Sequence, residues 1–227
     1  MTHLIGLTGV AGSGKDAVAG FLRELGWASG AFADLLKMIC AEAFPDVPRE
    51  VWWGSSELRS TPLREGGPTA REALQTLGDW GRALDPDVWV RWGIRRAKSL
   101  HGAIHPGVGA GPLPAHRDAE GTYWPSLVAC DAEGRISGVA LTDARFANEM
   151  VAIRAAGGVI WRVYRRGAGL SGAAARHQSE MEQGGLPVDT TLDNSTTLDD
   201  LRDRVHEALH ALVNRIGAAG RIGDRLV

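Results

Sequence analysis

The sequence LIGLTGVAGSGKDAVAGFL, residues 4–22, carries the strongest structural signal in the chain. An apolar run at residues 4–7 predicts a strand. It is followed by a glycine-rich loop at residues 9–14 and by an apolar stripe with helical spacing. Together with Lys15, the loop fits the phosphate-binding pattern G-x-x-x-x-G-K-[ST], which Asp16 breaks at the last position. The stretch therefore predicts an α/β fold that binds nucleotide phosphates.

The glycine-rich loop has the chemistry that a triphosphate needs. Glycine adopts backbone conformations that other residues avoid, so successive N–H groups can turn toward one phosphate. The N-terminus of the following helix adds partial positive charge there, and Lys15 can reach the β- and γ-phosphates. A glycine-rich turn capped by Asp16 is the simpler alternative. The residues predicted to bind ATP are Gly9, Ala11, Gly12, Ser13, Gly14, Lys15, Asp16 and Ala17.

Two aspartates are candidates for a magnesium site. Asp16 stands where Ser or Thr normally meets the metal, and a carboxylate is also a hard oxygen ligand that suits Mg²⁺. Asp143 follows the apolar run at residues 138–141, which we expect to form a strand parallel to the first. Ligands gather at the carboxyl ends of such strands, so Asp143 is the second predicted metal ligand. The alternative for Asp143 is a plain helix cap.

Composition favours a cytoplasmic protein with a single domain, residues 1–227. Hydrophobic residues make up 44% of the chain, an ordinary fraction for a globular protein. The 25 basic and 27 acidic residues give a net charge of −2 without a long basic run, which disfavours bulk DNA binding. We see neither a signal-peptide pattern nor an apolar run near the ~20 residues of a membrane span. Cys40 and Cys130 fit reduced core thiols.

The rest of the chain alternates helical and strand patterns. Gly26 should end the first helix, Thr69 and Glu72 form a capping box, and Asp87 should cap a later helix. Predicted helices cover residues 15–25, 32–44, 70–84, 88–100, 145–156 and 198–216. Predicted strands cover 27–29, 127–130, 136–141, 159–163 and 190–194, with 127–130 and 136–141 as a hairpin. Residues 54–68 are predicted to be loop and 217–227 a frayed tail. Predicted core side chains are Phe32, Leu35, Leu36, Ile39, Leu74, Leu77, Leu84, Leu198, Leu201, Val205, Leu209, Leu212 and Ile216.

One helix in the region of residues 38–100 carries arginines on one face. Arg71, Gln75 and Arg82 recur at intervals of about four and seven residues, so they share one side of the helix. Arginines on helices inserted between strands suit an anionic acceptor, because guanidinium groups match phosphate geometry. A solvated charged face is the ordinary explanation for such a run.

Two glycine-rich segments are expected at the surface. Residues 101–126 contain three histidines at irregular spacing, without supporting cysteines or paired carboxylates, so we predict a surface insertion rather than a metal site. Residues 165–185 contain Arg165, Arg166 and Arg176 among glycines and alanines. Such a segment suits a lid that closes over phosphates and excludes water. A basic surface loop is the alternative.

Several blocks of the sequence together resemble the deoxynucleoside monophosphate kinases of tailed bacteriophages. The blocks occur in order and span nearly the whole chain, although residues 101–126 lie outside the resemblance and the lid matches loosely. The GKD variant combined with D-x-R-F-x-N-E is the most specific feature. The blocks are G-x-x-G-S-G-K-D at Gly9–Asp16, F-A-D-x-L-K at Phe32–Lys37, R-E-x-L-Q-x-L-G at Arg71–Gly78, D-x-R-F-x-N-E at Asp143–Glu149, H-x-S-E at His177–Glu180, and Asn194 before the last helix.

The resemblance implies transfer of the γ-phosphoryl group of ATP to a deoxynucleoside 5′-monophosphate. It implies a P-loop NTPase fold, with a five-stranded, mainly parallel sheet between helices, a helical acceptor-binding region at 38–100 and an arginine-bearing lid. Mg²⁺ is the expected cofactor and ATP the co-substrate, with no nucleic-acid or membrane partner. The chain would act in the cytoplasm, that of the host if it is phage-encoded, and a homodimer is left open.

The resemblance also suggests roles for individual residues. Lys15 would hold ATP, and the arginines of the lid would neutralise charge on the transferred group. Trp89 would stack on a base, and Glu149 would orient an arginine. The predicted catalytic residues are Lys15, Arg145, Arg165, Arg166 and Arg176. The predicted substrate-binding residues are Lys37, Arg71, Gln75, Arg82, Trp89, Asp143, Arg145, Asn148 and Glu149.

Three other functions remain open at this point. The nearest is a kinase of another small acceptor, such as phosphomevalonate or dephospho-coenzyme A, on a similar scaffold. A DNA-handling ATPase is disfavoured by the balanced charge and short length. A nucleotide-binding module without catalysis is the third.

Overall fold

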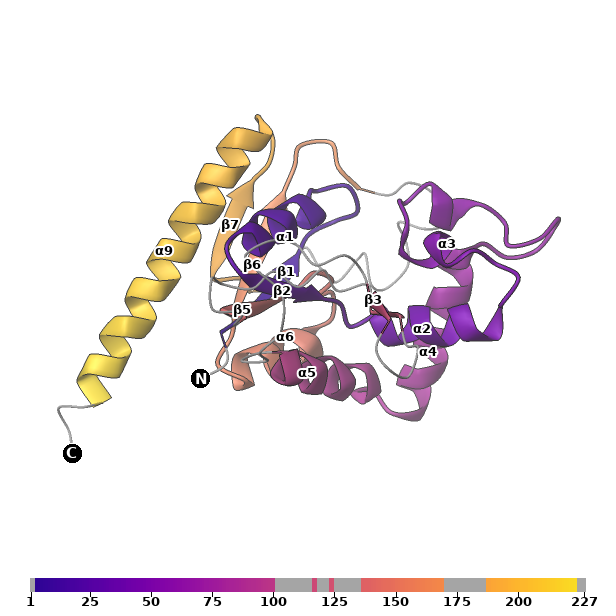
Figure 1. Cartoon of the computed structure of the whole chain (residues 1–227), viewed down its shortest axis with the longest axis horizontal. Coiled ribbons are helices and arrows are strands. Elements are labelled where there is room, and N and C mark those ends of the chain that lie inside the picture. Colours follow the sequence, from indigo (N-terminus) through magenta and orange to yellow (C-terminus); the bar gives the residue numbers. More distant parts are fainter. Residues whose placement is uncertain (1–2, 101–115, 118–122, 125–135, 170–186, 224–227) are drawn as a thin grey trace.

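The computed structural model describes residues 3–100, 116–117, 123–124, 136–169 and 187–223. A five-stranded sheet lies at its centre (Figure 1), and every strand pair in this sheet is parallel. In order across the sheet, the strands are β2 (Trp27–Gly30), β5 (Gly138–Leu141), β1 (Leu4–Thr8), β6 (Val159–Tyr164) and β7 (Thr190–Asp193). The predicted α/β class and the five-stranded parallel sheet are therefore confirmed.

Helices cover both faces of the sheet. The helices α1 (Lys15–Glu24) and α9 (Leu198–Gly223) pack on one face, where Leu22 and Trp161 are fully buried. On the other face α5 (Val88–Leu100) and α6 (Ala147–Ala155) lie side by side (Figure 1), and Ile153 is buried there. Burial on both faces explains why β1 reads as a continuous apolar run rather than an alternating one.

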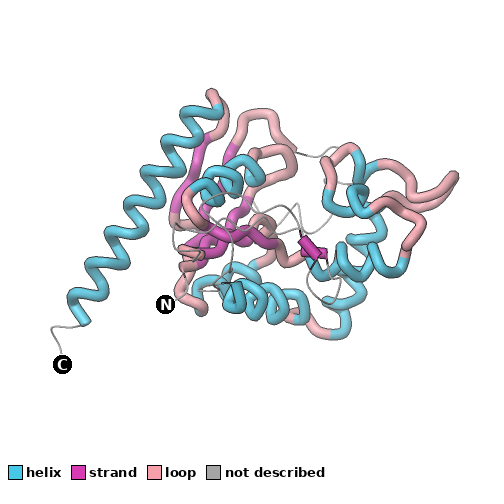
Figure 2. The backbone as a smooth tube through the Cα atoms, viewed as in Figure 1, coloured by secondary structure: helices cyan, strands magenta, loops and turns pink. Residues whose placement is uncertain are grey.

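Four short helices form a separate group at one end of the strand layer (Figure 2). The group has its own small core around the fully buried Trp52 and the buried Cys40. Its helices are α2 (Asp34–Ala43), α3 (Arg49–Trp53), the 3₁₀ helix η1 (Leu58–Ser60) and α4 (Ala70–Leu84). Because α5 packs on the sheet instead, the helical region predicted at 38–100 divides into this group and a sheet-covering helix.

Local sequence signals account for three of the helix ends. The capping box at the start of α4 is confirmed: the Glu72 N–H donates to Thr69 Oγ1 at 3.1 Å, and the Thr69 N–H donates to Glu72 Oε2 at 2.8 Å. Gly26 follows α1 at a φ of +84°, a conformation that favours glycine. The last helix begins after Thr197, whose Oγ1 accepts from the Asp200 N–H at 3.1 Å. It continues to Gly223, beyond the predicted end at residue 216.

Three predicted core side chains are exposed instead. The exposed fractions are 40% for Ile39, 70% for Leu84 and 61% for Leu198. Leu84 is the last residue of α4 and Leu198 the first of α9, so both project past the layer that covers their helix. Ile39 lies off the stripe of α2 that packs on the small core through Cys40. The side chain of Ile216 lies outside the described residues.

The predicted hairpin between residues 127–130 and 136–141 is wrong, although the second segment forms the strand β5 and runs parallel to β1, as predicted. β5 lies between β2 and β1 and pairs with both in parallel, so no edge of it is left for an antiparallel partner. Residues 127–135, including Cys130, lie outside the described residues. Within the predicted insertion, β3 (His116–Arg117) and β4 (Tyr123–Trp124) form a short antiparallel pair. Among the described helices, none is long and apolar enough to span a membrane.

Candidate functional site

The carboxyl ends of the strands bring most predicted site residues to one edge of the sheet. β1 leads into the glycine-rich loop, β5 into Asp143, β6 into Arg165 and Arg166, and β7 into Asn194. Across the sheet, β2 and β5 lie on one side of β1, whereas β6 and β7 lie on the other side. Ligands of parallel sheets bind in the crevice at such a reversal of strand order, so this edge is the candidate site.

The glycine-rich loop has the backbone geometry that its sequence requires. Gly9, Gly12 and Gly14 have φ values of +141°, +76° and +105°, which residues with a side chain rarely adopt. A Cβ atom on Gly12 would meet nothing within 4 Å, so the loop is open on that side. The Lys15 ammonium donates to the carbonyls of Gly9 at 2.5 Å and Val10 at 3.0 Å. It thus lies folded over the loop, where an anion could be bound.

Asn194 supports the loop from below. Its buried side-chain amide donates to the Ser13 carbonyl at 2.8 Å and leaves no room for a side chain on Gly14. The hydroxyl groups of Thr8 and Ser13 are buried nearby, and neither has a hydrogen-bond partner among the described residues. A buried polar group without a hydrogen-bond partner costs free energy, so these two hydroxyl groups favour binding of an ordered water or a ligand beneath the loop. In the sequence, Asn194 was noted only through the resemblance.

Asp143, the second predicted metal ligand, binds two backbone N–H groups, and its contact with a metal stays a prediction. Its Oδ1 accepts from the Phe32 N–H at 2.7 Å, and its Oδ2 accepts from the Ala33 N–H at 2.9 Å. The carboxylate therefore ties the end of β5 to the loop before α2 and is not a cap of α6. With both oxygens occupied by backbone donors, Asp143 is better placed to reach a metal through water than directly.

Asp16 remains the candidate for a direct metal ligand. Its carboxylate is exposed and accepts no hydrogen bond from any described residue. Within the described part of the chain, no group of three or more His, Cys, Asp or Glu side chains could hold a metal ion. Mg²⁺ is usually bound through one or two carboxylates together with substrate phosphates. Asp16 could therefore supply one carboxylate ligand to Mg²⁺ beside substrate phosphates.

Two of the three arginines predicted to bind the acceptor phosphate lie on α4, but they differ in freedom. Arg71 Nη2 donates to Ser56 Oγ at 2.5 Å, in the loop before η1. Arg82 is held by Asp79 at 2.6 Å and lies 4.6 Å over the ring of Phe146. Arg71 is thus held beside η1 by a neutral hydroxyl, whereas Arg82 already has a carboxylate partner. Gln75 is half-buried on the same helix.

Three residues predicted to line the acceptor pocket have partners within the protein. Trp89 is only 6% exposed, its Nε1–H donates to the Gly78 carbonyl at 3.0 Å, and its ring packs on Gly81, so it is not available to stack on a base. Asn148 donates to the Pro86 carbonyl at 2.9 Å and to Asp87 Oδ1 at 2.8 Å, which joins α6 to the α4–α5 turn. Lys37 forms an ion pair with Asp34 at 3.1 Å. The side chain of Asp87, which was predicted to cap a helix, thus accepts a hydrogen bond from Asn148.

Glu149 is buried at the start of α6. Its Oε2 accepts from the N–H groups of Arg145 at 2.6 Å and Phe146 at 3.0 Å. Burial raises the pKa of this carboxyl to about 8, and the nearby Asp143 charge contributes in the same direction. Glu149 therefore holds the backbone of Arg145 in place, and its burial favours the protonated form.

The predicted lid is described only at its beginning. Arg165 and Arg166 are exposed, and the Arg166 N–H donates to Ser195 Oγ at 3.1 Å. Arg176 and residues 170–185 lie outside the described residues, so the lid stays a prediction.

The sequence analysis missed Arg59. This residue lies on η1, inside the segment predicted as loop, and outside every block of the resemblance. Its guanidinium is half-buried and close enough to Arg71, Arg145, Asp16 and Asp143 for each to affect its pKa. No local signal marked it, because a lone arginine in a polar loop is usually solvated.

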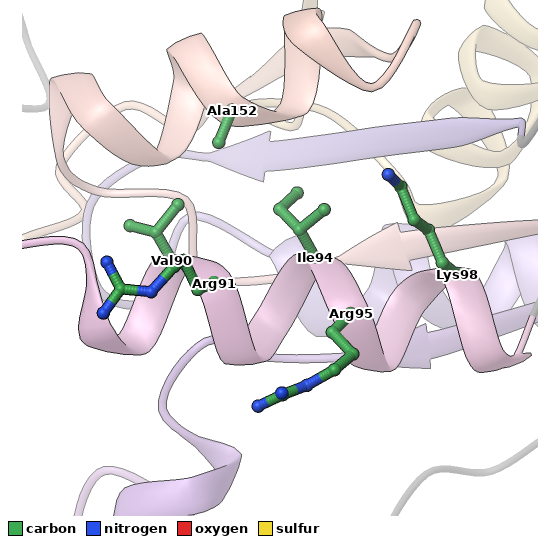
Figure 3. Close-up of a pocket in the computed structure, with 6 residues that line it drawn as sticks. All are labelled: Val90, Arg91, Ile94, Arg95, Lys98 and Ala152. Carbon is green, nitrogen blue, oxygen red and sulfur yellow. The ribbon is translucent and has the colours of Figure 1, made fainter.

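A groove lies between α5 and α6 (Figure 3), and none of its lining residues is a predicted site residue. Its volume is about 370 Å³. Val90, Ile94 and Ala152 face the space between the two helices, and Arg95 points away from it (Figure 3). We call this the α5 groove; its lining residues are Val90, Arg91, Ile94, Arg95, Lys98 and Ala152.

Comparison with known proteins does not add a family to this description. No protein-family model matches the chain, and no curated protein matches it with significant sequence similarity.

Proposed function

We propose that this protein is a Mg²⁺-dependent kinase that transfers the γ-phosphoryl group of ATP to a deoxynucleoside 5′-monophosphate. The observation that carries the proposal is the glycine-rich loop with Lys15, located where the strand order reverses and approached by arginines of the helical group. In this proposal the fold is of the P-loop NTPase class. Residues 165–185 are its lid, and the protein acts in the cytoplasm.

The donor nucleotide would be held by the glycine-rich loop. Backbone N–H groups at positive-φ glycines and the N-terminus of α1 offer donors and partial positive charge to its phosphates. Lys15 would exchange its two carbonyl acceptors for phosphate oxygens, which accept more strongly because they are charged. Asn194 keeps the loop in the shape that this exchange needs.

The acceptor would be bound between the loop and the helical group. Its phosphate is an anionic nucleophile, so no general base is needed, and catalysis rests on position and charge. Arg71 and Arg145 are the arginines best placed to hold it, with Arg145 fixed through Glu149. Bound Mg²⁺ supplies charge neutralisation between the phosphates, and Asp16 would hold it, with Asp143 acting through water.

The proposal is tested by ADP release from ATP and Mg²⁺ with each of the four deoxynucleoside monophosphates. We expect release only when a deoxynucleoside monophosphate is present, together with formation of the matching diphosphate. Release with phosphomevalonate or dephospho-coenzyme A alone would assign a different small acceptor. Release with DNA, or without any acceptor, would assign an ATPase and overturn the proposal.

A further inference from the structure

Arg59 has a rigid backbone setting. Its N–H donates to the Ser55 carbonyl at 3.1 Å, and the residues on either side are fixed as well. The Ser60 hydroxyl donates to the Ser56 carbonyl at 2.7 Å, and the Thr61 hydroxyl donates to the Leu58 carbonyl at 2.7 Å. Short-range hydrogen bonds therefore hold the backbone on which the Arg59 side chain is carried.

The guanidinium of Arg59 is half-buried but has no hydrogen-bond acceptor or carboxylate partner among the described residues. A half-buried charge without an acceptor is unfavourable, because water no longer solvates it fully. Arg82 and Arg91 differ in this respect, since each binds a carboxylate.

The charges around Arg59 come from both sides of the candidate site. Burial lowers the pKa of Arg59, and the like charges of Arg71 and Arg145 lower it further, while Asp16 and Asp143 oppose them. Arg71 comes from the helical group, Arg145 from the end of β5, and Asp16 from the start of α1. We call Arg59, Arg71 and Arg145 the arginine cluster. Arg59 is the member of this cluster whose guanidinium has no partner among the described residues, so an anion is the ligand that would complete its environment.

We propose that Arg59 is a catalytic residue that contacts the phosphoryl group in transit between the two nucleotides. This inference rests on the proposed kinase function. In the transfer, the bond from Pγ to the ADP oxygen breaks as a bond from Pγ to an acceptor phosphate oxygen forms, and the bonding electron pair leaves with ADP. Arg59 is close enough to Asp16 of α1 and to Arg71 of α4 for both charges to act on it, and Arg71 is held beside the same segment by Ser56 Oγ at 2.5 Å. Charge shared between the leaving and attacking oxygens would lie between these groups.

The test compares Arg59→Ala and Arg59→Lys with the control Arg64→Ala, an exposed arginine of the same loop. Three probes are titrated: ATP, the deoxynucleoside monophosphate and a bisubstrate analogue that joins both through a pentaphosphate chain. We expect Arg59→Ala to weaken the analogue by about 100-fold and each nucleotide alone by less than about tenfold. Its kcat should fall in proportion, Arg59→Lys should restore only part of the loss, and Arg64→Ala should change neither.

Other results would overturn the inference. Equal weakening of ATP and of the analogue would assign Arg59 to the donor alone, and equal weakening of the monophosphate and the analogue would assign it to the acceptor alone. A lower unfolding temperature with unchanged binding of all three would leave only a structural pairing with Asp16 and Asp143. If the wild-type protein phosphorylated no deoxynucleoside monophosphate, the proposed function would fail. A separate measurement would then decide whether Arg59 binds a phosphate chain. Inorganic tripolyphosphate should raise the unfolding temperature of the wild-type protein, and Arg59→Ala should abolish that rise.

Discussion

The arginine cluster and the α5 groove each gather three cationic side chains, but in opposite ways. The members of the cluster are half-buried and come from three separate segments. In the α5 groove, Arg91, Arg95 and Lys98 are exposed along one helix, and Arg91 already binds Asp85. Water screens the exposed charges, whereas half-buried charges interact more strongly with each other and with a ligand. The two regions therefore differ in convergence and in access to water, not in the number of cations.

The largest expected difference separates Lys15 from the groove lysine Lys98. Lys15→Ala should lower kcat/KM for phosphoryl transfer by at least about 100-fold, because it removes the ammonium group over the glycine-rich loop. Lys98→Ala should leave kcat/KM within about twofold, because an exposed lysine far from the charge transfer contributes little. Steady-state kinetics on both variants checks this. Near-wild-type activity of Lys15→Ala would contradict the donor site.

A smaller difference is expected between Arg71 and the groove arginine Arg95. Arg71→Ala should weaken binding of the deoxynucleoside monophosphate by about 10- to 100-fold, the usual value of a charge-assisted hydrogen bond, and ATP binding much less. Arg95→Ala should change neither. Calorimetric titration of each nucleotide distinguishes the two effects. An equal loss for both nucleotides would remove Arg71 from the acceptor side.

The candidate site should also carry a pH dependence that the groove lacks. The pKa of Glu149 is raised from 4.5 to about 8, so the folded protein binds this proton more tightly than the unfolded chain does. Its contribution to stability is therefore full below about pH 4.5 and is lost as the pH rises toward 8. Glu149→Gln keeps a carbonyl acceptor for the two N–H groups, so it should flatten this decline. Denaturant unfolding between pH 5 and pH 9 measures it, and an unchanged slope in the variant would refute the assignment.

The smallest effect is expected at the exposed pair of the groove. The hydrogen bond from Arg91 holds the pKa of Asp85 below its usual value, so this contribution is present at neutral pH and is lost only as the pH falls through the acidic range. Because both side chains are in solvent, Arg91→Ala should change the unfolding temperature only slightly and the kinetics not at all. A marked loss of activity would show that the two basic regions are coupled.

Local sequence signals were reliable wherever the cause of a structure is local. The capping box at Thr69, the strand before the glycine-rich loop and the stop at Gly26 all depend on residues within a few positions of each other. The site was predicted less completely. Trp89 was expected to stack on a base, yet Gly81 leaves space for its ring in the core, and that contact joins two helices. Ile39 has helical spacing, but only the position of the small core decides which side of α2 is buried.

Chain-distant contacts explain the remaining differences. Asp143 binds the N–H groups of Phe32 and Ala33, more than one hundred positions away. Asn194 supports a loop near the opposite end of the chain, and no pattern near it specifies that partner. The electrostatic environment of Arg59 comes from charged residues near β5, α1 and α4, which are distant from it in the sequence.

By itself, the sequence determined the α/β class, the parallel strand at the glycine-rich loop and the backbone freedom that this loop requires. These properties follow from residue type and short-range spacing, because glycine permits positive φ and apolar runs must be buried. Only the tertiary structure decided which charged side chains meet at the edge of the sheet, and that Arg59 is one of them. It also decided which carboxylates already bind backbone N–H groups and which do not. Electrostatic interactions depend on the distance between charges in space and on their burial, and neither quantity can be predicted from sequence positions alone.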